Sequence, residues 1–197
     1  HYITLGKELP AKALDEILTD HAEVFTELKE YYKQTSESDT TKISFYEDTY
    51  SLYNLYRFAH YYEEAYGKYI WLKSGASLVI EHTEAMTVID VNTGSVLKKK
   101  KQEDTLFYQI NREAAKEIAR QLRLRNISGI IMIDFINMKD TAQKEKLLSL
   151  LDSECKKDRV HCNVIDMTAL NLVEMTRSKV RKPLHEQIRS CMKNNRS

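Results

Sequence analysis

Two short apolar runs that each end in an aspartate constrain the fold of this chain more than any other feature. Residues 86–90 end at Asp90 and residues 129–134 end at Asp134, and both runs are rich in β-branched side chains, which favour strands. The charged residues 113–125 between them have the spacing of a helix. A strand, a helix and a second strand predict a βαβ unit, in which the two strands lie side by side and parallel.

This βαβ unit also predicts where a ligand would bind. In such sheets ligands gather beyond the carboxyl ends of the strands, where both aspartates are expected. Two close carboxylates repel each other, and a bound cation removes that penalty. Because the candidate ligands are oxygen atoms only, we expect a hard ion, Mg²⁺ or else Mn²⁺, held by Asp90 and Asp134. Asn92 points the same way as Asp90 in an extended segment and is expected to hydrogen-bond a phosphate oxygen or a metal-bound water.

The same aspartates also have a purely structural interpretation. An aspartate that follows a strand can cap the helix or turn that comes next, because its carboxylate accepts hydrogen bonds from backbone N–H groups. On the residues alone, the capping and metal-binding interpretations both remain open for the pair.

The rest of the chain predicts a mixed α/β fold. We expect a largely parallel sheet flanked by helices in residues 67–197, preceded by a mostly helical segment over residues 1–66. The only tryptophan, Trp71, is expected to anchor the core. Residues 170–175 suit either a strand or a helix. The expected helices are residues 11–33, 52–66, 141–156 and 184–192, and the expected strands are residues 43–46, 69–72, 77–81 and 160–165.

Composition limits the cellular compartment and the classes of binding partner that are expected for this chain. A formal net charge of +1 gives no global basic field that would indicate nucleic acid, so such a signal must be local. The three cysteines show no CxxC spacing, which argues against a disulfide framework and against a cysteine zinc site within this chain. Since the apolar runs are too short to span a bilayer and no signal peptide is visible, we expect a cytoplasmic protein without a membrane partner.

Two local basic clusters are the candidates for a polyanion contact. A lysine run is usually just a solvated loop. Two clusters, one of them in the loop that leaves the candidate metal site, favour contact with backbone phosphates. The first cluster is Lys98, Lys99, Lys100 and Lys101, and the second is Arg177, Lys179, Arg181 and Lys182.

Six sequence blocks, in this order, resemble the ribonuclease E/G family. Together they extend over about residues 69–182 without large gaps, and six blocks in order make the resemblance highly specific. The blocks are WLKSGASLVI at 71–80, TEAMTVIDVNTG at 83–94, NREAA at 111–115, EIARQLRLRN at 117–126, IDFI at 133–136 and LVEMTR at 172–177.

This resemblance implies a magnesium-dependent endoribonuclease that hydrolyses single-stranded RNA to 5′-phosphate and 3′-hydroxyl ends. Residues 67–197 would form the family's deoxyribonuclease-I-like catalytic subdomain with a C-terminal tail, and residues 1–66 part of its ribonuclease-H-like subdomain. The aspartates matching Asp90 and Asp134 hold the catalytic magnesium in the family, and the asparagine matching Asn92 supports the scissile phosphate.

The family pattern is incomplete in this chain, which keeps other functions open. In the family, an OB-fold RNA-binding domain and a 5′-phosphate sensor lie upstream, and a paired-cysteine zinc link that joins subunits lies downstream. Here Cys191 has no partner cysteine near it. We therefore expect a fragment or truncated member, with a homo-oligomer possible but without that zinc link. The alternatives are a non-catalytic RNA-binding or assembly module that retains the fold and, less favoured, another metal-dependent phosphoesterase.

Overall fold

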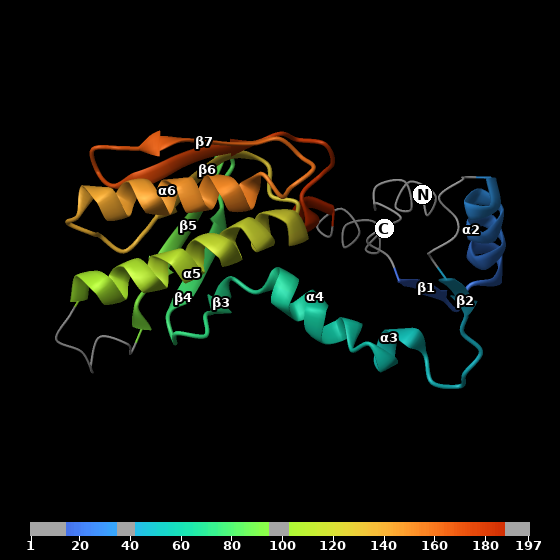
Figure 1. Cartoon of the computed structure of the whole chain (residues 1–197). Helices are drawn as coiled ribbons and strands as arrows, with labels where there is room; N and C mark the ends of the chain where they lie inside the picture. Colours follow the sequence, from blue (N-terminus) through green and yellow to red (C-terminus); the bar gives the residue numbers. More distant parts are fainter. Residues whose placement is uncertain (1–14, 35–41, 95–102, 188–197) are drawn as a thin grey trace. The chain divides into compact units, whose positions relative to one another are not determined.

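The computed structural model describes residues 15–34, 42–94 and 103–187 of the 197-residue chain (Figure 1). The chain divides into two compact units, His1–Tyr62 and Glu63–Ser197. Within the described residues, no helix combines the length and the apolar composition needed to cross a membrane.

The first unit contains a small parallel sheet and a helix. Strand β1 (Glu16–Thr19) pairs in parallel with β2 (Lys42–Phe45), and helix α2 (Ala22–Gln34) connects them. The expected strand at residues 43–46 is confirmed. The expected helix over residues 11–33 begins outside the described residues; it was wrong at Glu16–Thr19, which form β1, and is found as α2 further on. The pairing with β2, which lies more than twenty positions further on, stabilises β1 and is not visible in the local spacing.

A second helix was expected over residues 52–66, and the structure divides it in two. Helix α3 (Leu52–Leu55) begins after Ser51, whose hydroxyl oxygen accepts a hydrogen bond from the backbone N–H of Asn54. Helix α4 (Phe58–Tyr66) follows. Between them Arg57 adopts φ +50°, a left-handed conformation that ends a helical turn.

The second unit is built on a six-stranded sheet with the order β3-β4-β5-β6-β8-β7. The mixed α/β fold is confirmed, but the expectation of a largely parallel sheet was wrong, because among the described strands of this unit only β5 and β6 are parallel neighbours. The strands are β3 (Tyr69–Trp71), β4 (Ser77–His82), β5 (Met86–Asn92), β6 (Gly129–Asp134), β7 (Cys162–Met167) and β8 (Leu172–Arg177).

The last two strands, β7 and β8, help to explain why the sheet is mostly antiparallel and not largely parallel as expected. The strand expected at residues 160–165, as part of the largely parallel sheet, corresponds to β7. A tight turn, closed by the Thr168 amide donating to the Leu172 carbonyl at 2.8 Å, folds β8 straight back onto it. Strand β8 then takes the inner position beside β6, because it buries Val173 and Met175, and the more exposed β7 is left at the edge. A two-strand hairpin is necessarily antiparallel.

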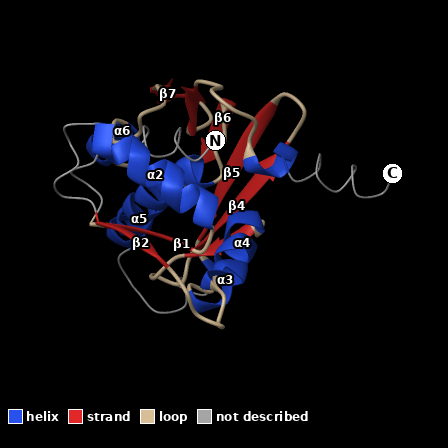
Figure 2. Cartoon of the chain, turned by 90° about the vertical axis from the view of Figure 1, so that its right-hand side faces the viewer, coloured by secondary structure: helices blue, strands red, loops and turns tan. Residues whose placement is uncertain are grey.

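Helices α5 (Glu103–Leu124) and α6 (Thr141–Cys155) pack on one face of this sheet. Figure 2 shows both helices on the same side of β4, β5 and β6. Alternate residues of the strands, such as Ile89, Ile131 and Ile133, are fully buried under them. The residues between these, including Asp90 and Asp134, therefore lie on the opposite face, which no described helix of this unit covers; we call it the open face.

Candidate functional site

Asp90 and Asp134 lie directly opposite each other in the parallel β5–β6 pair. Each stands at or near the carboxyl end of its strand, and residues in register on neighbouring strands project from the same face. The structure thus brings together two carboxylates that are far apart in the sequence, on the open face and at the end of the sheet where the sequence predicted them.

The surroundings of Asp90 and Asp134 disfavour a negative charge on both carboxylates at once. Partial burial raises the pKa of Asp134, and the negative charge of Asp90 raises it further. A carboxylate with a raised pKa beside another carboxylate is the arrangement that a cation would relieve, so the donor set fits a hard metal ion. Among the described residues, however, no three His, Cys, Asp or Glu side chains gather closely enough to form a complete ligand set by themselves.

Asn92 takes part in the same group through Asp90. Its Nδ2 donates a hydrogen bond of 2.6 Å to Oδ2 of Asp90, because residues two apart on a strand project from the same face. This bond fixes the orientation of the Asp90 carboxylate. The contact with a phosphate expected from the sequence remains a prediction.

The turn between β3 and β4 is held against this end of the sheet by two contacts that the sequence analysis missed. Glu113 of α5 accepts hydrogen bonds from the backbone amides of Lys73, at 2.7 Å, and Ser74, at 3.2 Å. Gly94 has φ +55°, and a Cβ at this position would lie 2.9 Å from the carbonyl oxygen of Gly75. A local pattern gives no signal for either contact, since the partners are 19 to 40 positions apart.

The second basic cluster does not lie at the carboxylates. Arg177 pairs in register with Gly129, the first residue of β6, whereas Asp134 is the last. At about 3.4 Å per residue these two ends of β6 are about 17 Å apart. Lys179 and Arg181 follow Arg177 in the chain and are exposed, and Lys179 Nζ lies 3.6 Å from a carboxylate oxygen of Glu186.

Arg177 itself is part of the core. Its side chain is only 3% exposed, and Nε lies 2.9 Å from Oδ2 of Asp158 in a buried ion pair. One terminal nitrogen also donates to Oδ1 of Asn126, at 2.9 Å, and to the Ile127 carbonyl, at 3.0 Å. The prediction that Arg177 contacts RNA is therefore replaced by a structural role. The other basic cluster, Lys98 to Lys101, lies outside the described residues.

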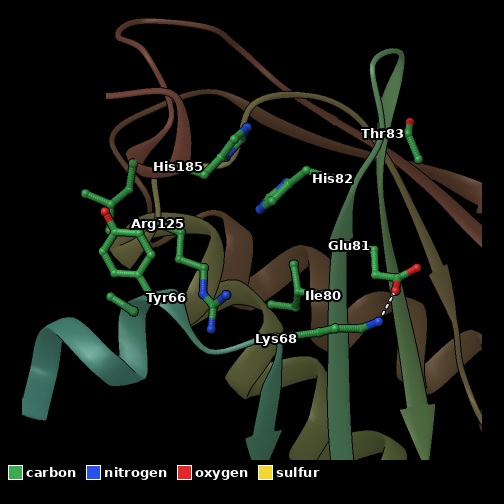
Figure 3. A pocket seen from close by; sticks show the side chains of 10 residues that line it. Tyr66, Lys68, Ile80, Glu81, His82, Thr83, Arg125 and His185 are labelled. Atoms are coloured by element: carbon green, nitrogen blue, oxygen red, sulfur yellow. Dashed lines mark ion pairs between the residues drawn. The ribbon is translucent and has the colours of Figure 1, made fainter. Parts of the chain in front are cut away.

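A cavity of about 320 Å³ lies at the opposite end of the sheet from the aspartates (Figure 3). His82 and His185 stack there with their ring centroids 3.9 Å apart, and His82 pairs in register with Thr87 at the start of β5. Arg125, also in the lining, is buried, and its Nε donates to Gln121 Oε1 at 2.7 Å. The cavity is therefore not part of the carboxylate site.

Comparison with known proteins gives consistent matches. The model of the ribonuclease E/G family matches residues 2–180. The chain is 38% identical over 171 residues to ribonuclease G of Escherichia coli K12, and 39% identical over 171 residues to ribonuclease G of Haemophilus influenzae Rd; each match covers 87% of this chain and 35% of the relative. It is 34% identical over 176 residues to ribonuclease E of Nostoc sp. PCC 7120, covering 88% of this chain and 26% of that protein. The chain thus spans only about a third of the length of the ribonuclease G relatives.

Proposed function

Because this chain belongs to the ribonuclease E/G family, we propose that it is a metal-dependent endoribonuclease whose catalytic carboxylates are Asp90 and Asp134. The observation that supports this most directly is their register: they are opposite neighbours in β5 and β6, the one parallel pair among the described strands of this sheet. The expected substrate is single-stranded RNA, and the expected products carry 5′-phosphate and 3′-hydroxyl ends.

The two aspartates would hold one Mg²⁺ or Mn²⁺ through carboxylate oxygens. Such an ion, when bound, lowers the pKa of a water molecule and offsets charge on the phosphate. Hydrolysis then adds the water oxygen to phosphorus and breaks the bond from phosphorus to the 3′ oxygen, which takes up a proton. Two carboxylates are an incomplete ligand set, which leaves positions for water and for the RNA phosphate, as is usual for Mg²⁺.

Asn92 would position both a carboxylate and the substrate. A side-chain amide has two N–H donors, and one of them donates to Asp90 Oδ2. The other would donate to a non-bridging oxygen of the scissile phosphate. Asn92 thereby keeps Asp90 in one orientation while the phosphate is held next to it.

The test is cleavage of an unstructured oligoribonucleotide by the 197-residue protein in the presence of Mg²⁺, with the product ends identified. We expect Asp90→Asn and Asp134→Asn to slow cleavage about 100-fold or more, in the range found for loss of a principal electrostatic group. Asp152→Asn is the matched control, because Asp152 is half-exposed on α6 and, among the residues that the structure describes, forms an ion pair only with Lys156. Cleavage by both active-site variants at the wild-type rate would contradict the assignment.

A non-catalytic RNA-binding module is the second candidate, since the chain spans only 35% of the ribonuclease G relatives. In that case the wild-type protein would bind RNA with an affinity that falls as salt rises, and no cleavage would be detected with either Mg²⁺ or Mn²⁺.

A further inference from the structure

Trp71 is the only tryptophan of the chain and lies on β3, an edge strand of the sheet. The expectation that it anchors the core was wrong, because 73% of its surface is exposed. It pairs in register with Ser77, which pairs in register with Asn92. Trp71 is therefore at the same end of the sheet as the carboxylate site, and with about 4.8 Å between strands its backbone is about 10 Å from that of Asn92.

Trp71 borders a hollow of about 430 Å³ between the edge of β3 and helix α5, which we call the edge hollow. An exposed aromatic side chain on its own is unremarkable in a folded protein, so its surroundings decide what it can bind. Four cationic side chains line the same hollow: Lys73, Lys116, Arg120 and Arg123.

The carboxylates of the edge hollow are already used within the fold. Glu113 accepts hydrogen bonds from the Lys73 and Ser74 amides, and Glu117 accepts from Arg120 Nε, at 3.0 Å, and from Gln121 Nε2, at 2.7 Å. Neither Lys73 nor Lys116 makes an ion pair with any residue that the structure describes. The edge hollow is therefore positively charged. Trp71, which the register places on the open face together with Asn92, borders this hollow at the edge strand β3.

We propose that the edge hollow binds a single-stranded segment of the RNA substrate, with one base stacked on Trp71 and phosphates next to Lys73 and Lys116. This inference rests on the proposed function, since it takes the RNA to be the strand that reaches Asp90 and Asp134. Aromatic stacking with flanking cations suits unpaired bases and does not require a particular sequence. The distance of about 10 Å corresponds to about three nucleotides of a stacked strand.

Tryptophan fluorescence, excited selectively so that tyrosine does not contribute, tests this directly, because all tryptophan emission of the protein comes from Trp71. The probe is a labelled 2′-O-methyl oligoribonucleotide, which resists hydrolysis, added to the full chain with Mg²⁺. We expect quenching of the emission over the same concentrations at which the anisotropy of the RNA label rises. An abasic strand of equal length keeps the phosphates and is expected to bind without quenching.

Substitutions separate the stacking contact from the phosphate contacts. Trp71→Ala is expected to weaken RNA binding about tenfold, the usual effect of losing one base–aromatic stack, whereas Trp71→Phe keeps a ring and should stay within about threefold of wild type. Lys73→Gln and Lys116→Gln should each reduce the slope of log affinity against log salt by about one. Lys156→Gln, at an exposed lysine just after α6 that does not line the hollow, should leave that slope unchanged.

The outcomes distinguish this inference from the proposed function. RNA binding without any change in Trp71 emission, and with wild-type affinity in Trp71→Ala, would overturn the inference while Asp90-dependent cleavage could still stand. Quenching and a weakened Trp71→Ala variant in a protein that never cleaves RNA would support the RNA-binding hollow and overturn the nuclease. Absence of RNA binding would overturn both.

Discussion

Asp134 is the side chain of the candidate site whose ionisation is made unfavourable by its surroundings. Burial and the charge of Asp90 raise its pKa in the folded protein, so the folded state binds the proton more tightly than the unfolded chain does. This contribution to stability is fully present below the ordinary pKa of an aspartate and is lost as the pH rises through the raised pKa. At neutral pH the ionised Asp134 therefore destabilises the fold unless a cation is bound.

We predict that Asp134→Asn raises the Tm by roughly 1 to 3 °C at pH 7 in EDTA, because it removes the like-charge repulsion while keeping the shape of the side chain. Mg²⁺ should raise the Tm of the wild type but not that of the variant, since binding to the folded state alone stabilises it. Thermal unfolding with and without Mg²⁺ measures both effects. An equal Mg²⁺ response in the two proteins would argue against a site at Asp134.

Arg177 shows the opposite case, a basic residue whose charge is satisfied inside the protein. We predict that Arg177→Met destabilises the protein by about 3 to 5 kcal/mol, since it leaves Asp158 buried and unpaired. The double variant with Asp158→Asn should recover part of this loss. Urea unfolding of the wild type, the two single variants and the double variant gives the coupling energy between Arg177 and Asp158. A loss of less than about 1 kcal/mol in the free energy of unfolding of Arg177→Met would contradict the role assigned to the pair.

At the scale of elements, Glu113 joins α5 to the turn between β3 and β4. We predict that Glu113→Ala lowers the free energy of unfolding by about 1 to 2 kcal/mol, because two backbone amides lose a charged acceptor. Hydrogen exchange at the Lys73 and Ser74 amides should accelerate. Lys116→Ala, one turn further along the same helix, is the matched control and should leave both amides protected.

Elements with a local signal were predictable from the sequence. The apolar runs of β5 and β6 and the periodicity of α5 and α6 depend on neighbours within a few positions, and all four elements are found, although α5 (Glu103–Leu124) begins well before residues 113–125, where its helical spacing was noted. The pairing of β1 and of the β7–β8 hairpin depends on strands elsewhere in the chain. The segment of β1 was predicted as helix, the strand expected at residues 160–165 was found but in an antiparallel pair, and residues 170–175, left open between strand and helix, lie largely in β8. Local spacing carries no information about which distant strand will pair.

In the candidate site, too, some features could be predicted from the sequence and others depend on the complete fold. The adjacency of Asp90 and Asp134 followed from the βαβ rule, which relates distant residues through topology. The exposure of Trp71 and the burial of Arg177 did not follow, because each depends on residues that only the complete fold brings near. For Arg177 the deciding partner is Asp158, which lies on the loop before β7 and has no periodic relation to β8.

At the scale of the whole molecule, the main core belongs to one unit. All of its buried members lie between Ile70 and Met175, within the unit Glu63–Ser197. We predict that a protein lacking residues 1–57, which keeps α4 complete, still unfolds cooperatively, with a urea midpoint close to that of the matching transition in the full chain. Loss of cooperative unfolding on this deletion would show that the core needs the first unit.

The single parallel pairing of the described sheet has a consequence for when activity can arise during synthesis. Antiparallel neighbours can join through a short turn, but β6 reaches β5 only after the crossover helix α5 has been made and folded. A nascent chain that has not yet extended past Asp134 holds one half of the proposed cation site. On our proposal such a chain is inactive. The nascent nuclease therefore does not cleave the messenger RNA from which it is being translated until β6 has left the ribosome.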